Sequence, residues 1–488
     1  MENEATWRFD NSLVRALEGF FVPAQVERAP APRLTILNRA LAEALGLALP
    51  LDDAEHLLVG NALPVEAEPV ALAYAGHQFG GFSPVLGDGR ALLLGEIVAP
   101  DGRRFDLQFK GSGRTPFSRG GDGKLALGPA LREYLISEAM AALCVPTTRI
   151  LSVVETGEVV QRDQPHPGAV ALRVAASHLR VGTFEWAARA PGTDALRQLA
   201  DYALLRHYPA AAHAPNPYLA LVEAVMDAQI ALVAQWMSLG FVHGVMNTDN
   251  VAISGEAIDY GPCAFLDAYS AREVFSSIDR QGRYAFGNQS AICHWNMVRL
   301  ASALLALIEA VDAQGVAQCQ ALLDTFPARF RRAWVARMRP KFGLFSDEED
   351  DAALVEGLFA ALEGQRVDFT NLFRALATSL TQGDDVVRDL LREPYALDDW
   401  LADWHARLAR EEPPPEERAA QMNAVNPLYI PRNHMVDAAL SAAEAGDMVP
   451  FMQVLEVVTH PYVERADWAD YAQGAPADAP HHVTYCGT

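Results

Sequence analysis

Residues 241–266 read FVHGVMNTDNVAISGEAIDYGPCAFL, and two polar residues stand out in this stretch. Asn250 precedes the apolar residues 251–253, for which we expect a short strand, and Asp259 follows a turn at Gly255. An amide oxygen before a strand and a carboxylate after it are suitable ligands for a Mg²⁺ ion that bridges phosphate groups. The simpler alternative is an Asn-containing turn and an ordinary strand-terminal Asp. We favour the metal site because the surrounding residues fit the same pattern.

That pattern is the catalytic loop of protein kinases, H-R-D-x-x-x-x-N, followed by D-F-G. His243 takes the first position, where we expect a structural brace, Asn250 takes the metal-binding Asn and Asp259 takes the metal-binding Asp. Val245 stands where kinases keep their catalytic Asp. Asp249 could act as a base for a differently placed acceptor, or it could only cap the loop; we favour the base. The stretch therefore predicts a kinase-shaped nucleotide site that lacks the usual base.

Length and charge restrict the class of protein. The chain has 488 residues, of which 50% are hydrophobic and 21% are charged, as in globular proteins with several subdomains. Its 39 Lys and Arg against 62 Asp and Glu give a net charge of −23. A strongly acidic surface repels polyanions, so we expect no broad binding to nucleic acid or to anionic membranes.

Targeting signals are not evident. The N-terminal MENEATWRFDNSLVRALEGFF mixes acids with arginines and matches neither a secretory signal nor a mitochondrial presequence. No run approaches the roughly eighteen consecutive apolar residues of a transmembrane helix. The five cysteines are scattered without a C-x-x-C pair, which is typical of a reducing compartment. These features predict a cytoplasmic protein.

The first part of the chain is expected to be helical and irregular, and then rich in strands. The spacing of Leu and Ala predicts a helix over residues 35–47. Residues 91–98 and 105–109 read as two strands of a hairpin that turns at Asp101-Gly102.

Lys110 ends the second of these strands, where a kinase keeps its phosphate-binding lysine. A helix over residues 129–143 carries Glu133, in the place of the glutamate that pairs with that lysine. A lysine at a strand end is usually only solvated, but this order of elements favours a phosphate site. Arg173 and Arg180 are individually more typical of structural residues, and they gain weight as basic exceptions in an acidic chain.

Glycine-rich segments are weaker signals. Residues 76–89 read as a turn cluster more readily than as a phosphate-binding loop. The sequence GGDGK at 120–124 resembles a P-loop, but Leu125 stands where that motif requires Ser or Thr. No Rossmann fingerprint follows a first strand.

The remaining elements are expected as follows. Residues 150–177 read as further strands with a turn at Thr156-Gly157, and helices are expected over 221–239 and 295–311. Residues 320–488 read as helices joined by acidic linkers, such as EEPPPEE, and as a Pro- and Ala-rich tail.

These residues resemble the selenoprotein O family, pseudokinases that act as protein adenylyltransferases. The resemblance covers most of the chain and is densest in YAGHQFGGFSPVLGDGRALLLGE, LQFKGSGRTPFSRGGDGK, LREYLISEAMAAL, HGVMNTDN and IDYGP. It implies a kinase-like fold that binds ATP in a flipped orientation. AMP would then pass to Ser, Thr or Tyr hydroxyls of proteins, with Mg²⁺ or Mn²⁺ present and with release of pyrophosphate.

Roles follow from the resemblance motif by motif. The implied nucleotide-binding residues are Gly87, Gly89 and Arg90 in GDGR, Asp122 and Gly123 in GGDG, Lys110 with its partner Glu133, Arg173, Arg180 and Asp259. Asp249 is similar to the proposed base, and Asn250 and Asp259 resemble the metal ligands.

The family normally ends in a Cys or selenocysteine near the C-terminus, and Cys486 occupies that place. Some members carry a partner Cys after the D-Y-G motif for a regulatory disulfide. Residues 268–278 contain no Cys here, so such a switch would need Cys263 or Cys293 instead.

We therefore predict an α+β, protein-kinase-like two-lobe fold with helical extensions. Residues 1–68 would form an N-terminal extension, 69–185 a β-rich N-lobe, 186–320 a helical C-lobe and 321–488 a C-terminal extension and tail. The predicted function is metal-dependent AMPylation, with ATP and protein substrates as partners and with neither nucleic acid nor membrane. The alternatives are transfer of the γ-phosphate, with Asp249 as the base, and a non-catalytic ATP-binding scaffold.

Overall fold

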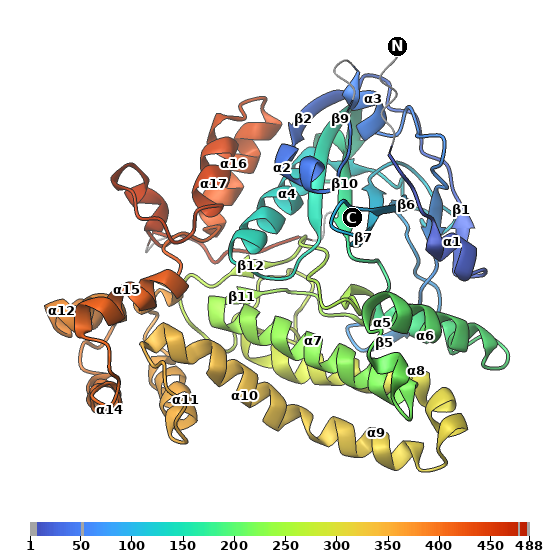
Figure 1. Cartoon of the computed structure of the whole chain (residues 1–488). Coiled ribbons are helices and arrows are strands. Elements are labelled where there is room, and N and C mark those ends of the chain that lie inside the picture. Colours follow the sequence, from blue (N-terminus) through green and yellow to red (C-terminus); the bar gives the residue numbers. More distant parts are fainter. Residues whose placement is uncertain (1–6, 50–52, 477–478, 486–488) are drawn as a thin grey trace.

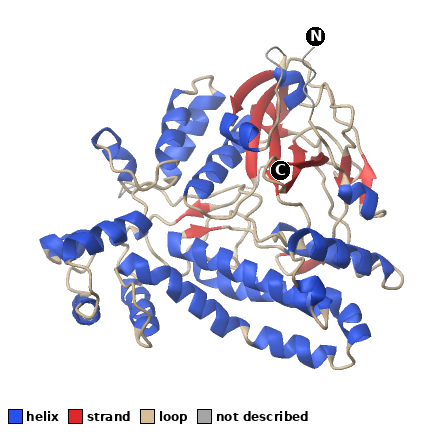
Figure 2. Cartoon of the chain, in the orientation of Figure 1, coloured by secondary structure: helices blue, strands red, loops and turns tan. Residues whose placement is uncertain are grey.

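The computed structural model describes residues 7–49, 53–476 and 479–485. It is a mixed α and β structure in which one large sheet and a set of helices occupy different parts of the molecule (Figures 1 and 2). Within the described residues the large sheet has eight strands, paired antiparallel in the order β1-β3-β6-β7-β10-β9-β2, with β8 beside β10. These strands are β1 (Phe21–Pro23), β2 (Arg33–Leu37), β3 (Val70–Leu72), β6 (Ala91–Val98), β7 (Arg104–Lys110), β8 (Leu125–Ala126), β9 (Arg149–Gln161) and β10 (Pro165–Ala175).

The β6–β7 hairpin confirms the prediction made from the alternating apolar runs. Gly102 lies in its turn with a φ of +85°, a conformation that favours glycine. The predicted helix over 129–143 is α4 (Leu127–Ala142), and it packs on β9 and β10. Together these elements bring the end of β7 close to the side chains of α4.

Two predictions in this part of the chain are wrong. The helix expected over residues 35–47 does not form over its whole length, because β2 occupies its first residues. The shorter α2 (Arg39–Ala44) begins after Asn38, whose side chain caps it by accepting a hydrogen bond from Leu41 N at 3.0 Å. The turn expected at Thr156-Gly157 lies inside β9, at a register shift where Gly157 has a φ of +80°. β1 and β2, from the expected N-terminal extension, thus belong to the large sheet.

The helical part lies below the sheet in Figure 1. The predicted helices over 221–239 and 295–311 are confirmed as parts of α7 (Pro217–Leu239) and α8 (Gln289–Val311), which pack against each other. The short strands β11 (Phe241–Val242) and β12 (Ala264–Phe265) pair between the sheet and these helices. The other helices here are α5 (Val181–Ala187), α6 (Asp194–His207), α9 (Gly315–Asp324) and α10 (Phe326–Met338).

Two helical runs, Pro217–Leu239 and Phe286–Val311, are long and apolar enough to cross a membrane by length and composition alone. In each, 56% of the apolar window is buried inside the structure. Core helices of globular proteins pass the same test, so the expected absence of a membrane span stays a prediction.

The C-terminal helices return to the sheet. α16 (Asn433–Glu444) and α17 (Val449–Val458) pack on α4, and Glu444 accepts a hydrogen bond from Gly128 N at 2.9 Å (Figure 1). The preceding helices are α11 (Asp351–Leu362), α12 (Phe369–Gln382), α13 (Asp385–Arg388), α14 (Asp398–Leu408) and α15 (Pro415–Val425).

Candidate active site

Lys110, at the end of β7, joins two carboxylates. Its Nζ donates to Glu133 of α4 and to Asp259 Oδ1, the latter at 2.7 Å. Lys110 and Glu133 are buried, whereas the Asp259 side chain is 32% exposed. Burial alone would raise the pKa of Asp259, but the charges of Lys110, Arg90 and Arg173 outweigh it and hold that pKa well below its usual value. The structure thus brings together five basic and acidic residues that lie far apart in the sequence.

Asp259 has an unusual backbone conformation. Its φ is +70°, in the left-handed region that side chains other than Gly, Asn and Asp rarely adopt. Tyr260, the next residue, is buried and shares a hydrogen bond with the Thr147 hydroxyl. The anchored Tyr260 side chain fixes the direction in which the carboxylate points.

Arg173 and Arg180 are both buried beside this cluster. Arg173, on β10, donates to Gln108 Oε1, and Gln108 in turn donates to Asp88 Oδ2 at 2.9 Å. Arg180 donates to the backbone oxygen of Asp249 at 2.8 Å and lies over the Tyr74 ring at 4.5 Å. Nε of each guanidinium is buried without a hydrogen-bond partner. Two desolvated cations at one place favour a polyanionic ligand.

The segment GDGR at 87–90 leads into β6 under a covering loop. Gly87 has a φ of +67°, and a Cβ there would lie 2.2 Å from Cγ of Phe117. The Thr115 and Ser118 hydroxyls donate to the backbone oxygens of Asp88 and Gly89. Gly87 is therefore required by packing as well as by its backbone conformation.

The other glycine-rich segment, at 120–124, lies in the same covering loop. Asp122 pairs with Arg162, with Nη1 2.7 Å from Oδ2, and accepts from Lys124 N at 2.9 Å. A Cβ at Gly123 would lie 2.0 Å from Gly113 O. Among the described residues, neither Asp122 nor Gly123 contacts the Lys110 cluster, so their role as nucleotide contacts stays a prediction.

Asp249 lies in the 3₁₀ turn Thr248–Asn250 and is almost completely buried. Its Oδ2 accepts from Gln78 Nε2 at 3.1 Å, and its Oδ1 has no hydrogen-bond partner. Burial raises the pKa of Asp249 to about 6. A carboxylate with one held and one unsatisfied oxygen has the properties of a general base.

Asn250 follows directly and donates its Nδ2 to Val245 O at 3.1 Å, which turns its amide oxygen the other way. The strand expected over residues 251–253 is wrong. Residues 251–253 form only an isolated bridge between Ala252 and Arg180, flanked by hydrogen bonds from Val181 N to Val251 O and from Ile253 N to Leu179 O, both at 3.0 Å, before the chain turns at Gly255.

His243 has the contacts of a brace. Its Nε2 donates to Ile258 O at 2.9 Å and its ring stacks on Trp236 at 5.3 Å. Burial lowers its pKa, so the ring is neutral. It ties the loop that carries Asp249 to the segment that carries Asp259.

Sequence reasoning missed the hairpin of β4 (Gly76–Gln78) and β5 (Gly81–Ser83), which lies on the catalytic loop. His77 N donates to Thr248 Oγ1 at 2.7 Å, and Phe79 N donates to Asn247 Oδ1 at 2.9 Å. With the contact from Gln78 to Asp249, the hairpin holds three consecutive residues of the loop. No spacing rule could have found these contacts, which join residues about 170 positions apart.

Two of the described cysteines, Cys263 and Cys293, lack the properties of redox-switch thiols. Cys486 lies outside the described residues. Cys263 and Cys293 are buried, and burial raises the pKa of the Cys263 thiol to about 12 and raises that of Cys293 as well. Buried thiols of high pKa are unreactive.

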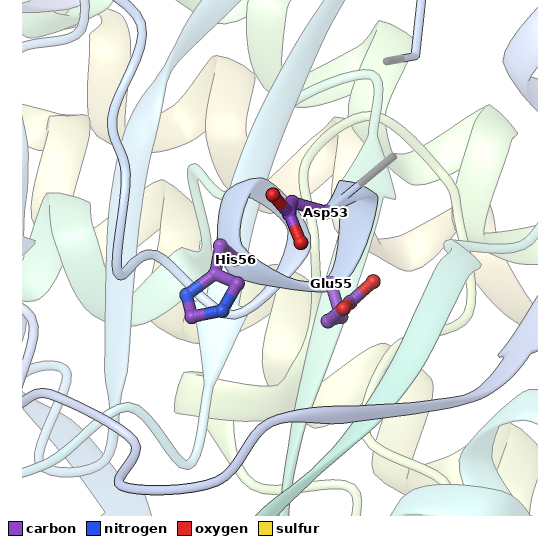
Figure 3. A group of neighbouring side chains, drawn as sticks. All are labelled: Asp53, Glu55 and His56. Atoms are coloured by element: carbon purple, nitrogen blue, oxygen red, sulfur yellow. The ribbon is translucent and has the colours of Figure 1, made fainter. Parts of the chain in front are cut away.

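The donor set fits a hard divalent cation. The amide oxygen of Asn250 and the carboxylate of Asp259 are oxygen ligands of the kind that Mg²⁺ and Mn²⁺ prefer. A second group, Asp53, Glu55 and His56, lies at the start of α3 (Ala54–Leu58), and one ligand atom from each residue lies within 4.8 Å of the others (Figure 3). Among the described residues, no further observation marks that group as a site.

Comparison with known proteins agrees with this geometry. The family model described as protein adenylyltransferase SelO matches residues 4–459. A protein nucleotidyltransferase YdiU of Sphingopyxis alaskensis is 56% identical over 483 residues, which cover 98% of this chain and 99% of the relative. A relative of the same name from Cereibacter sphaeroides (strain KD131) is 54% identical over 487 residues, which cover 99% of this chain and 100% of the relative. Another, from Rhodopseudomonas palustris (strain CGA009), is 49% identical over 490 residues, with the same coverage of 99% and 100%. The chain belongs to the SelO family of protein adenylyltransferases.

Proposed function

We propose that this protein transfers AMP from ATP to Ser, Thr or Tyr hydroxyls of proteins and releases pyrophosphate. The observation that carries the proposal is the combination of an intact Lys110–Glu133–Asp259 cluster with Val245 at the usual base position and with a buried carboxylate at Asp249. A decayed nucleotide site would have no need to keep the ion cluster. Transfer from an inverted nucleotide accounts for both the lost base and the retained cluster.

The basic residues bind the triphosphate in this proposal. Lys110 Nζ, held between Glu133 and Asp259, contacts phosphate oxygens as a point charge, and Arg173 and Arg180 add donors from the adjacent sheet and loop. Their placement on rigid elements fixes the α-phosphate toward the acceptor, which lowers the entropic barrier to reaction.

Asp249 moves the proton. Its Oδ1, unsatisfied and buried, accepts the proton of the acceptor hydroxyl as the new bond from oxygen to the α-phosphorus forms. The bond between the α-phosphorus and the bridging oxygen breaks, and pyrophosphate leaves with that electron pair. Gln78 holds the other oxygen of Asp249 throughout.

Asn250 and Asp259 would hold a Mg²⁺ or Mn²⁺ ion, which supplies charge neutralisation for the phosphates. We also propose that the sheet and the helical part are the two lobes of a kinase-like fold, with residues 69–185 and 186–320 as their cores. The position of the Lys110 cluster, between the sheet and the loop after α7, supports this arrangement.

Product analysis tests the proposal. The purified protein would be incubated with ATP and Mg²⁺ or Mn²⁺, and released pyrophosphate and ADP would be quantified. Pyrophosphate in wild type, lost in Asp249→Asn and retained in the exposed control Asp101→Asn, is the expected result. ADP without pyrophosphate would instead show phosphoryl transfer, and no product would favour a binding scaffold.

A further inference from the structure

A pair of arginines lies beside the β4–β5 hairpin and takes no part in the Lys110 cluster described above. Arg283 stacks over the Trp295 ring of α8 at 4.7 Å, and Arg299 lies over the same ring at 5.5 Å. Arg283 also touches the tip of the β4–β5 hairpin, where a Cβ on Gly80 would lie 3.6 Å from its Cζ. We call Arg283, Trp295 and Arg299 the arginine–tryptophan cluster.

Within the part of the chain that the structure describes, no carboxylate forms an ion pair with Arg283 or Arg299, and Arg283 has the Tyr284 hydroxyl as a neutral partner. Asp279, on the same loop as Arg283, uses its two oxygens to accept from the backbone N of Arg283 at 2.9 Å and of Tyr284 at 2.7 Å. Nε and Nη2 of Arg283 and Nε of Arg299 are buried without a hydrogen-bond partner. Stacking on an aromatic face orients a guanidinium but does not neutralise it. In a chain of net charge −23, such a cluster is a preorganised site for an anionic group.

The β4–β5 hairpin links the cluster to the proposed base through a short series of contacts. Gln78 contacts Asp249 at 3.1 Å, the Phe79 ring lies 5.2 Å from that of Tyr284, and Gly80 touches Arg283. Gln78 and Gly80 are two residues apart, and two residues of any chain span at most about 7 Å, so we take roughly two or three residues of a bound polypeptide as the span from Asp249 to the cluster. Phe79 and Phe82 are 36% and 45% exposed on the same hairpin and offer an apolar surface beside it.

We propose that the arginine–tryptophan cluster and the β4–β5 hairpin form the docking surface for the acceptor segment of the protein substrate. The segment carries an Asp or Glu two or three residues from the acceptor hydroxyl. The carboxylate binds Arg283 and Arg299 while the hydroxyl lies at Asp249. This inference rests on the proposed function and adds the sequence preference of its substrate.

Acceptor peptides test the inference. Peptides with a single Ser would carry Asp, or Asn as the neutral match, two or three residues to either side, and AMP transfer would be followed at varied peptide concentration. For wild type we expect KM to be about tenfold or more lower for the best Asp peptide than for its Asn match, as expected for a charge-assisted hydrogen bond. Arg283→Gln should remove this difference by raising KM for the Asp peptide, with kcat and the Asn peptide little changed.

Arg280→Gln is the matched control, because Arg280 is exposed on the same loop, and it should keep the preference. Arg283→Glu should reverse the preference in favour of a Lys peptide, which separates a charge effect from a loss of structure. Equal use of Asp and Asn peptides by wild type, or an unchanged preference in Arg283→Gln, would overturn the inference. Failure of wild type to release pyrophosphate from ATP would instead contradict the proposed function.

Discussion

The two ends of β7 each carry a buried ion cluster, and the clusters differ in one respect. At the C-terminal end, Lys110 pairs with Glu133 and Asp259. Near the N-terminal end, Asp106 accepts from Arg206 Nη2 at 2.7 Å and contacts His178 Nδ1 at 2.9 Å. The Asp106 side chain is 0% exposed, whereas that of Asp259 is 32% exposed.

The electrostatics follow this difference. Around Asp106 the charges are paired within the protein, because Arg206 bonds to Glu96 as well as to Asp106. The charge of Arg206 holds the pKa of Asp106 down to about 2 against the effect of burial. Burial lowers the pKa of His178 to about 4, so His178 is neutral. Around Lys110 the charges of Lys110, Arg90 and Arg173 act on Asp259, and this carboxylate is partly exposed to solvent. A closed network stabilises the fold, and an open network of the same residue types is available to a ligand.

The largest effect is expected at the closed end of β7, that is, in the network around Asp106. Asp106→Asn should lower the free energy of unfolding by up to about 3–5 kcal/mol, because it removes one of the two carboxylates that pair with the buried Arg206 and leaves Glu96 as the other. Chemical denaturation measures this change. Asp101→Asn, in the exposed turn of the same hairpin, should stay within about 0.5 kcal/mol of wild type. A loss below about 1 kcal/mol in Asp106→Asn would show that this cluster is not structural.

Lys110→Met should lower kcat/KM for AMP transfer by about 10²–10³-fold, because it removes a preorganised cation from the phosphates. The assay should be run below the melting temperature of the variant, since Glu133 loses its buried partner. Lys124, which pairs with Glu27 and Glu158 nearby, provides the matched control Lys124→Met, with activity near that of wild type. Equal losses in both variants would contradict a specific role for Lys110.

The sequence predicted the residues at the open end of β7, around Lys110, well and those at the closed end, around Asp106, poorly. Lys110, Glu133 and Asp259 each lie at a recognisable place relative to a strand, a helix or a loop, so pattern and order were sufficient to group them. Asp106 and Arg206 follow no motif, and their pairing depends on the packing of α6 against the sheet.

Local signals also competed. The Leu and Ala spacing at 35–47 suggested a helix, but pairing with β9 drew residues 33–37 into the sheet. The dipeptide Thr156-Gly157 is typical of a turn, but here it forms a bulge in a long strand. The β4–β5 hairpin could not be placed because its contacts are with a loop distant in sequence.

A pH-dependent effect is expected near the closed end. Burial raises the pKa of Glu256 from 4.5 to about 7. The folded state therefore holds this proton more tightly than the unfolded chain does. The contribution of the protonated Glu256 to the free energy of unfolding is present in full below pH 4.5 and is lost as the pH rises through about 7, a loss of at most about 3.5 kcal/mol.

Glu256→Gln keeps an acceptor for Ala176 N and Ser254 Oγ but does not titrate. Its melting temperature should exceed that of wild type at pH 8 and approach it at pH 5. The difference between the two proteins at pH 5 and pH 8 is the measurement. A constant difference would show that Glu256 does not titrate in this range.

The smallest effect is expected at the edge of the open end. Arg162→Gln should raise KM for ATP by less than about fivefold, because the ion pair between Arg162 and Asp122 is partly exposed and such pairs contribute about 0–1 kcal/mol. The kcat value should not change. A change in KM above tenfold would mean that Asp122 is as important for the nucleotide as Lys110.

The most direct test of the open end as an adenylyl-transfer site is a split-label experiment. Parallel reactions with Mg²⁺ or Mn²⁺ would contain ATP labelled at the α- or the γ-phosphate, with wild type and Asp259→Ala. We predict protein-bound label from the α-phosphate only, and its loss in Asp259→Ala. Label from the γ-phosphate alone would contradict the account, because the same residues would then be catalysing phosphoryl transfer.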